Sequence, residues 1–162
     1  MSGTEGPLGT VRLLVETALS SRPLYEDVPA RATKGGRWIL DATPGLALGA
    51  AAGDVVEVDK EGAFRVTARG GNIAIHVSAA AGASQERDSL TEAIGSLGGR
   101  LDARAWTRDG SSSLSVYTVP AAAGFGPIEQ VLVEFASAAP GGEWYYGNVY
   151  DPADGTPLNW WD

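Results

Sequence analysis

The sequence predicts an α+β protein in which a small N-terminal antiparallel β-barrel-like unit packs on a ferredoxin-like βαββαβ unit. Two observations carry this prediction. Residues 72–149 alternate strand, helix, strand, strand, helix and strand patterns, which is the order of a split βαβ unit. Ahead of them, residues 11–70 hold short strand-like stretches separated by turn residues. Such stretches favour a barrel or a curled sheet, because closure leaves no exposed strand edge.

The N-terminal unit is predicted from its turns. Lys-Gly-Gly at 34–36 and Lys-Glu-Gly at 60–62 each separate two stretches with the composition of strands. Residues 11–16 fit a strand or a helix, and their neighbours favour a strand. Residues 1–10 contain Gly, Ser and Pro and are predicted to be a flexible N-terminus. The predicted strands are 11–16, 25–32, 37–41, 55–59 and 63–68.

Two apolar stripes predict the helices of the second unit. Each stripe has residues at i, i+3, i+4 and i+7, which places them on one helix face. Ser84 as N-cap bounds the first helix, residues 85–97, and Gly98-Gly99 ends it. Pro127 is predicted as the first residue of the second helix, which ends at Pro140. The stripes are Leu90, Ala93, Ile94 and Leu97, then Ile128, Val131, Leu132 and Phe135.

The strands of the second unit complete the division of the chain. Asp109-Gly110 is typical of a hairpin turn between the two middle strands. The predicted strands are 72–77, 101–108, 114–119 and 144–149. The predicted organisation is therefore a flexible N-terminus (1–10), an antiparallel β unit (11–70), a ferredoxin-like unit (71–150) and an aromatic C-terminal tail (151–162).

Composition excludes several classes of function. The 162 residues are 44% hydrophobic and 20% charged, as in an ordinary globular protein. The absence of cysteine removes disulfides and thiolate sites and fits a cytoplasmic location. No secretion signal and no apolar stretch of membrane-spanning length is present. The net charge of -8 argues against nucleic acid, which is bound by clustered Lys and Arg. Heavy use of Ala, Gly and Arg suggests a bacterial source.

The central part of the chain carries a family resemblance. Pro-Gly-Leu-Ala-Leu-Gly at 44–49 precedes Gly-Asp-Val-Val-Glu-Val at 53–58, and Gly-Gly-Asn follows at 70–72. This series, with the alternating tail after it, resembles a bacterial family of domains of unknown function over residues 25–146. The resemblance implies a core strand followed by a βαββαβ tail. It implies no activity and no catalytic residues.

Alternation along the strands predicts a candidate binding face. With both helices on one side of the sheet, Leu101, Ala103 and Ala105 are predicted to face them. The opposite side then carries aromatic and Arg side chains, which binding surfaces enrich. The alternative is that the first unit or the C-terminal tail covers this face. The predicted face consists of His76, Arg104, Trp106, Arg108, Tyr117 and Tyr146.

The sequence offers little for catalysis. His76 is the one histidine and therefore the ready general base near neutral pH, yet no Gly-x-Ser-x-Gly motif accompanies any serine. The acidic residues are scattered rather than spaced as metal ligands, and no cofactor motif stands out. Asp-Pro-Ala-Asp-Gly at 151–155 lacks the spacing of a calcium loop and is predicted to be a turn. We therefore expect no catalytic residue, no metal and no cofactor.

These observations favour a non-enzymatic, cytoplasmic bacterial binding or accessory protein. Its partner is expected to be a protein, as for an immunity-type protein, or a small molecule held between the two units. Trp160 and Trp161 are expected to dock on the protein's own core, with a partner as the alternative. A homodimer through the exposed sheet is a further alternative. The rival hypothesis is a small cofactor-free enzyme that uses His76 or a buried carboxylate in a pocket between the units.

Overall fold

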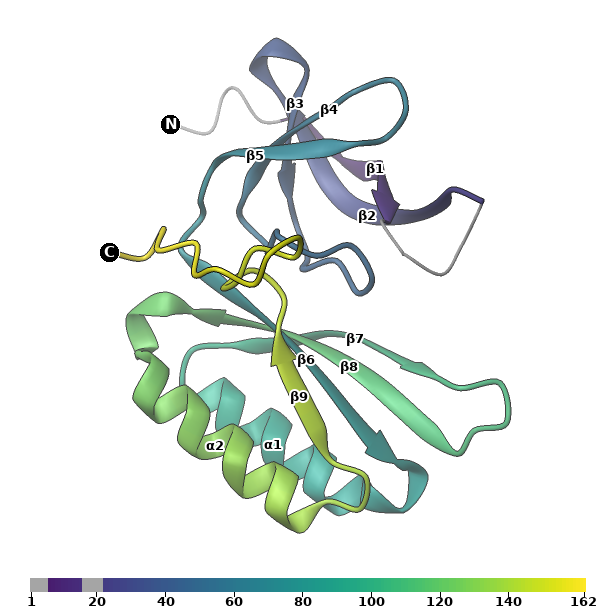
Figure 1. The fold of residues 1–162 in the computed structure, drawn as a ribbon, viewed down its shortest axis with the longest axis vertical. Helices are drawn as coiled ribbons and strands as arrows, with labels where there is room; N and C mark the ends of the chain where they lie inside the picture. Colours follow the sequence, from purple (N-terminus) through teal and green to yellow (C-terminus); the bar gives the residue numbers. More distant parts are fainter. Residues whose placement is uncertain (1–5, 16–21) are drawn as a thin grey trace.

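The computed structural model describes residues 6–15 and 22–162, which form two antiparallel sheets and two α-helices (Figure 1). The first sheet has the strand order β1-β2-β3-β4-β5, and the second has the order β7-β8-β6-β9. The strands are β1 (Leu8–Val15), β2 (Leu24–Thr33), β3 (Arg37–Leu40), β4 (Val55–Val58), β5 (Phe64–Ala68), β6 (Asn72–Ala80), β7 (Arg100–Trp106), β8 (Ser112–Pro120) and β9 (Glu143–Tyr146). The helices are α1 (Ser84–Ser96) and α2 (Phe125–Ala138).

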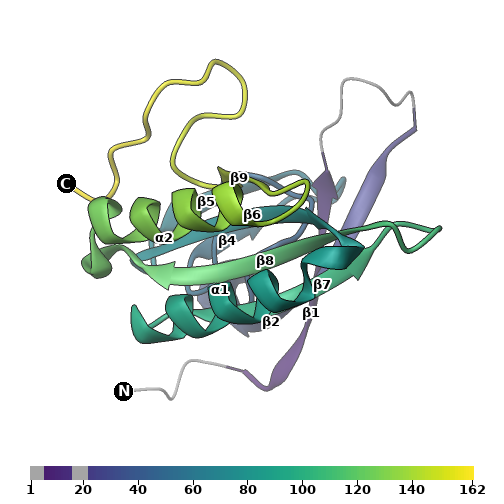
Figure 2. The same cartoon turned by 90° about the horizontal axis from the view of Figure 1, so that it is seen from below.

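The elements form successive layers. Both helices lie on one face of the second sheet, as Figures 1 and 2 show from two directions. The first sheet lies beyond the opposite face, and the chain between β3 and β4 and the C-terminal segment lie between the two sheets (Figure 1). We call the two sides of the second sheet the helix face and the inter-sheet face. The prediction of an α+β protein is confirmed.

The first sheet is not closed into a barrel, contrary to the prediction. Its end strands, β1 and β5, do not pair, and the Leu14 amide donates instead to the Gly62 carbonyl in the β4–β5 turn at 2.8 Å. Ala47 and Ala50, from the chain between β3 and β4, are buried in the core of this sheet. The curled sheet thus buries its apolar face against a loop and needs no closed ladder of strands.

The predicted element boundaries shift by a few residues. β1 starts at Leu8, inside the stretch predicted to be flexible, whose residues 1–5 lie outside the described residues. Helix α1 starts at Ser84, the predicted N-cap, and α2 starts at Phe125 rather than at Pro127. Pro127 still falls in the first turn, where its missing N–H leaves no helical hydrogen bond unmade.

A β-bulge interrupts β7. The register shifts between Leu101, which pairs with Tyr117, and Ala103, which pairs with Val116. The additional residue, Asp102, reverses the alternation of side chains along the rest of the strand, because strand side chains follow a strict period of two. Ala103 and Ala105 therefore lie on the inter-sheet face, opposite to the prediction from sequence.

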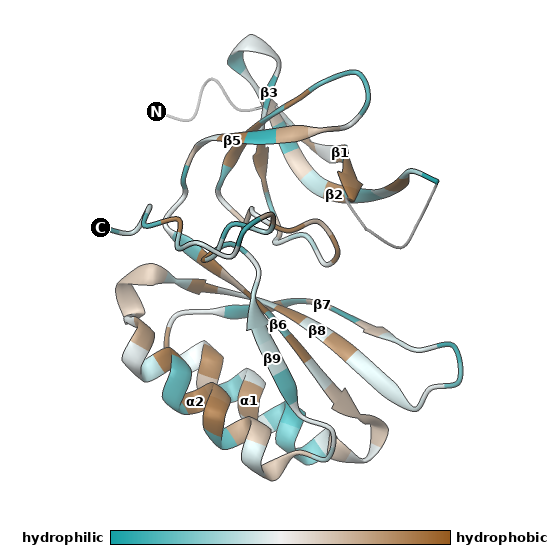
Figure 3. Ribbon diagram, in the orientation of Figure 1, coloured by the Kyte–Doolittle hydropathy of each residue, from teal (hydrophilic) through white to brown (hydrophobic). Residues whose placement is uncertain are grey.

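The C-terminal tail packs on the second core, as expected for Trp160 and Trp161. The Trp160 indole Nε1 donates to the Asn148 carbonyl at 2.8 Å. Its ring meets the Trp161 ring edge-to-face at 5.4 Å, and the Trp161 ring meets Phe125 in the same way at 5.2 Å. Brown, hydrophobic bands cross strands of both sheets, and the β7–β8 turn is hydrophilic (Figure 3). Neither α1 nor α2 has the length and apolar character that a membrane-crossing helix requires.

Candidate functional site

A chain of hydrogen bonds fixes the two units against each other. The Thr118 hydroxyl donates to Asp102 Oδ2 at 2.5 Å, and the Thr43 amide donates to the same oxygen at 2.8 Å. The Thr43 and Thr118 hydroxyls lie 2.7 Å apart. Because Thr118 gives its proton to the carboxylate, Thr43 must donate to Thr118. The Ala52 amide then donates to Thr43 Oγ1 at 3.1 Å, so β7, β8 and the β3–β4 loop are joined.

Asp54 organises the second connection between the units. Its buried carboxylate accepts from the amides of Ala51 at 2.9 Å and Gly70 at 2.8 Å. Burial raises the pKa of Asp54, while these hydrogen bonds and Arg69 oppose the shift. Gly70 packs directly on Gly53, since a Cβ at Gly70 would lie 2.4 Å from the Gly53 carbonyl carbon. The Gly-Asp and Gly-Gly strings of the sequence are therefore explained by close backbone packing around one carboxylate.

Arg69 extends from this junction into a cavity. Its Nη1 donates to the Gly49 carbonyl at 2.9 Å and to Asp54 Oδ2 at 3.2 Å. The guanidinium carbon lies 5.5 Å from the centre of the Trp160 ring, within cation–π range. Within the described residues, its Nε and Nη2 have no hydrogen-bond acceptor. Arg69 is thus held by the hydrogen bonds of Nη1 and by the Trp160 ring, and its Nε and Nη2 keep their N–H donors for another group.

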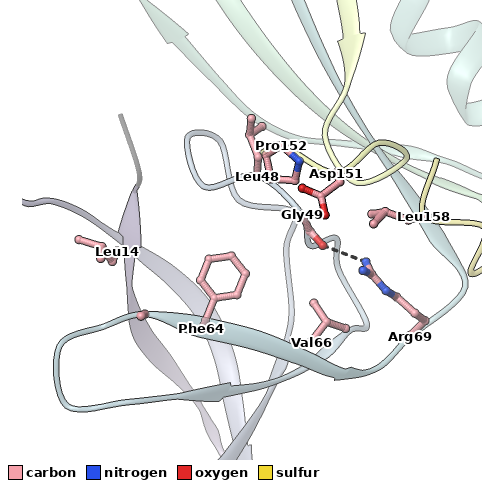
Figure 4. Close-up of a pocket in the computed structure, with 10 residues that line it drawn as sticks. Leu14, Leu48, Gly49, Phe64, Val66, Arg69, Asp151, Pro152 and Leu158 are labelled. Atoms are coloured by element: carbon pink, nitrogen blue, oxygen red, sulfur yellow. Dashed lines mark hydrogen bonds between the residues drawn. The ribbon is translucent and has the colours of Figure 1, made fainter. Parts of the chain in front are cut away.

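The cavity lies between the first sheet and the C-terminal segment and has a volume of about 390 Å³. Figure 4 shows Leu14, Phe64 and Val66 over β1 and β5, Leu48 of the β3–β4 loop beside Pro152 and Asp151, and Leu158 near Arg69. Its apolar lining comprises Leu14, Leu48, Ala63, Phe64, Val66, Pro152 and Leu158, and its charged lining comprises Arg69 and Asp151. A mostly apolar cavity with a few converging polar groups is typical of a small-molecule site.

Asp151 is fixed by a turn rather than by Arg69. Its Oδ1 accepts from the Ala153 amide at 2.7 Å, and its own carbonyl accepts from the Gly155 amide at 2.8 Å. This is the turn that the sequence predicts at 151–155. Arg69 makes its ion pair with Asp54, and among the described residues Asp151 has no ion-pair partner. Asp151 Oδ2 is therefore available to accept from a bound molecule.

His76 lies on the inter-sheet face, as predicted, but is fully buried. Its ring stacks on Tyr145 at 4.8 Å, and neither ring nitrogen has a partner in the part of the chain that the structure describes. Gly147 passes so close that a Cβ there would lie 2.7 Å from His76 Nε2. Burial lowers the pKa of His76 to about 4, partly offset by the negative charge of Glu26 and by the nearby Gly45 backbone. The imidazole is therefore neutral at pH 7.

The two tyrosines of the predicted face lie on the helix face instead. Tyr117 is fully buried, and its hydroxyl lies 2.7 Å from the Thr91 hydroxyl of α1. The Tyr146 hydroxyl donates to Glu129 of α2 at 2.8 Å. Tyr117 pairs with Ile75, whose side chain is in the helix-packed core, so the two residues must share a face.

Because of the β-bulge in β7, Arg104 and Trp106 of the predicted binding face also lie on the helix face. Arg104 donates from Nε to the Ser115 hydroxyl at 2.8 Å, on the helix face. Trp106 lies under Arg87 of α1, whose guanidinium carbon is 4.8 Å from the ring centre. Arg108 follows β7 and is exposed in the turn. The predicted cluster is thus divided between the two faces of the sheet and a turn.

A family match covers most of the residues described above. A family model described as "Domain of unknown function (DUF4265)" matches residues 26–143. The chain belongs to this family. The resemblance seen in the sequence is confirmed, and it brings no established activity. The DUF4265 match includes Leu48, Phe64 and Arg69, whereas Leu14 precedes it and Asp151, Pro152 and Leu158 follow it, so the cavity is lined from both inside and outside the family region.

A solved structure shows the same fold. It is described as "Novel crystal structure of a hypothetical protein from Neisseria gonorrhoeae" and matches with a TM-score of 0.63 at 18% identity. The match covers 86% of this chain and 94% of that chain. No curated protein matches. Among the described residues of this DUF4265 protein, no three acidic or histidine side chains gather as metal ligands.

Proposed function

We propose that this protein is a non-enzymatic, cytoplasmic bacterial binding protein that holds a small amphiphilic molecule in the Arg69 cavity. The observation that carries the proposal is an arginine with two unpartnered nitrogens in a mostly apolar cavity of about 390 Å³. We also assign the second unit to the ferredoxin-like class. The strand order β7-β8-β6-β9, with two helices on one face, supports this assignment.

The chemistry of the cavity defines the ligand class. Leu14, Phe64 and Val66 offer an apolar wall for an aliphatic or aromatic body. The free edge of the Arg69 guanidinium matches a carboxylate, which arginine binds through two parallel N–H donors. Asp151 supplies an acceptor for an ammonium group. A zwitterion with an apolar body, such as a short peptide with free termini, satisfies all three features.

The positions of the ionisable groups favour binding over catalysis. His76 and Asp54 are absent from the lining of the cavity, so neither side chain reaches a molecule bound there. Both Asp54 oxygens already accept backbone hydrogen bonds. An enzyme that used either group would need a path from the cavity to a buried side chain.

The proposal is tested with three probes that share one apolar body. Leu-Leu carries both terminal charges, N-acetyl-Leu-Leu keeps the carboxylate, and Leu-Leu-amide keeps the ammonium. Amide chemical shifts followed by NMR during titration give each Kd. We expect Leu-Leu to bind about ten-fold more tightly than either blocked form, since a charged hydrogen bond contributes about 1.5–3 kcal/mol. Equal binding of all three probes, or none at millimolar concentration, overturns the proposal.

Two variants locate the site. Asp151→Asn keeps the turn, because an asparagine oxygen also accepts from the Ala153 amide, but removes the charge from the cavity. It is expected to weaken Leu-Leu about ten-fold and to leave N-acetyl-Leu-Leu unchanged. Asp154→Asn is the matched control, since Asp154 caps the next turn through the Thr156 amide at 3.0 Å and does not line the cavity. An equal loss in both variants contradicts the assignment.

A further inference from the structure

A second cavity, of about 370 Å³, separates β2 from β7 and β8 on the inter-sheet face. Two of its walls are formed by four consecutive residues each, 26–29 of β2 and 102–105 of β7. Side chains of a strand alternate between faces, so one face alone would contribute every second residue. Consecutive lining residues show that both strands present their backbone edges to this groove.

The edge of β7 is open at Arg104. β7 is a terminal strand of its sheet, paired with β8 alone. The Thr107 amide donates to the Ser112 carbonyl at 2.9 Å, which fixes the direction of the backbone groups along the strand. Because the direction of the backbone groups alternates along a strand, the N–H and C=O of Ala105 and Ala103 also point to β8. The N–H and C=O of Arg104 therefore point outward, away from β8.

The edge of β2 is open at Asp27 by the same reasoning. The Pro29 carbonyl accepts from the Asp41 amide at 2.8 Å, on the side of β3. Two residues earlier, Asp27 directs its backbone N–H and C=O to that side as well. β3 pairs with β2 only from Ala30 to Thr33, so in the described part of the chain no strand pairs with Asp27 on this side.

The groove combines these edges with apolar and acidic side chains. The side of the groove formed by β7 and β8 is apolar and consists of Ala103, Ala105, Leu114 and Val116. The Glu26 carboxylate at the rim accepts from the amides of the β3–β4 loop at 2.6, 2.9 and 2.9 Å. The Arg104 guanidinium is bound to Ser115 on the helix face, away from the groove. The fixed charge at the rim is therefore negative.

We propose that an extended peptide segment, with small apolar residues alternating with basic ones, adds to β7 as a strand in this groove. Its backbone pairs with the open N–H and C=O groups of Arg104, and Asp27 offers the same groups across the groove. Its apolar side chains cover Ala105, Leu114 and Val116, and its basic side chains approach Glu26. Strand addition to an open sheet edge takes affinity from backbone hydrogen bonds and specificity from alternate side chains.

The probe is a fluorescein-labelled, end-blocked hexapeptide of alternating Val and Lys, followed by fluorescence anisotropy. Two matched peptides accompany it, one with Glu in place of Lys and one N-methylated at alternate residues. We expect the Val-Lys peptide to bind at least ten-fold more tightly than either. Binding of the N-methylated peptide with equal affinity overturns strand addition, and equal binding of the Glu peptide overturns the preference for basic residues. No binding of the Val-Lys peptide at millimolar protein overturns the whole proposal.

Ala105→Lys places a cation in the groove and is expected to weaken the Val-Lys peptide at least ten-fold. Ala68→Lys is the control, because Ala68 is also an exposed alanine of an edge strand but lies in β5, outside the groove. Equal effects of both substitutions overturn the assignment. The other possible occupant of the groove is a second copy of this chain, which light scattering detects as a doubled molar mass. If the protein dimerises and Ala105→Lys alone abolishes the dimer, the groove is a dimer interface and the peptide proposal is overturned. The site is separate from the Arg69 cavity, so the dipeptide titrations fail or succeed independently.

Discussion

Replacing His76 with leucine is expected to remove part of the protein's sensitivity to acid. His76 is fully buried, and its two ring nitrogens have no partner among the described residues. Protonation in the folded state would place a cation in this buried position, which is why burial lowers the pKa of His76 to about 4. Leucine fills a similar volume and does not titrate.

The size of the effect follows from proton linkage. In the unfolded chain the pKa of histidine is about 6.5, so between pH 6.5 and pH 4 the unfolded state binds more protons than the folded state. Stability therefore falls as the pH is lowered through this window and is fully retained above it. The two pKa values give a loss of about 2 kcal/mol between pH 7 and pH 5 and about 3 kcal/mol by pH 4.

The measurement is urea unfolding followed by tryptophan fluorescence, at several pH values from 7 to 5, above the pI of about 4.6. The carboxylates titrate alike in both proteins, so the difference between wild type and His76→Leu isolates the histidine. We expect His76→Leu to be at least as stable as wild type at pH 7, since it removes two unsatisfied buried nitrogens. Its advantage should grow by about 2 kcal/mol on going to pH 5. Parallel pH profiles would refute the reasoning.

Two further predictions concern the junction of the units. Gly70→Ala should lower the free energy of unfolding by about 1–3 kcal/mol or more, because the added Cβ would meet the backbone of Gly53. Gly82→Ala is the control and should not destabilise the protein, because no atom lies within 4 Å of a Cβ at that position. Equal urea midpoints for the two variants would contradict the packing argument. Thr43→Val and Thr118→Val should show a coupling energy of about 1 kcal/mol in a double-mutant cycle, since their hydroxyls bond each other. Strict additivity would exclude that bond.

Local patterns account for the elements that the sequence predicted well. The apolar stripes that include Leu90 and Ile128 lie in the helix-packed core. Apolar residues with a period of 3.6 lie on one face of a helix, and that face is the one buried. Across the hairpin whose turn the sequence predicts at 60–62, Glu57 and Arg65 form an ion pair, since register in a hairpin follows from its turn. These features depend on residues close together in the chain, and so a single sequence carries them.

The candidate site depends on contacts that no local pattern encodes. Arg69 and Asp151 are far apart in the chain and face one cavity only because the C-terminal segment returns past the first sheet. The sequence around Asp54 is typical of a turn, whereas in the structure its side chain is buried between two loops. The glycines at 53 and 70 were visible as part of the family resemblance, but their contact with each other was not.

The sequence by itself determined the α+β class and the order of the elements, and it favoured docking of the tryptophan pair on the protein's own core, which the structure decided. The tertiary structure alone decided which side chains share a face. One additional residue at Asp102 reverses the alternation of β7, which carries Arg104 and Trp106 to the helices and Ala105 to the groove. A bulge of this kind is set by pairing with β8 rather than by the composition of β7. Strict alternation therefore fails at this strand.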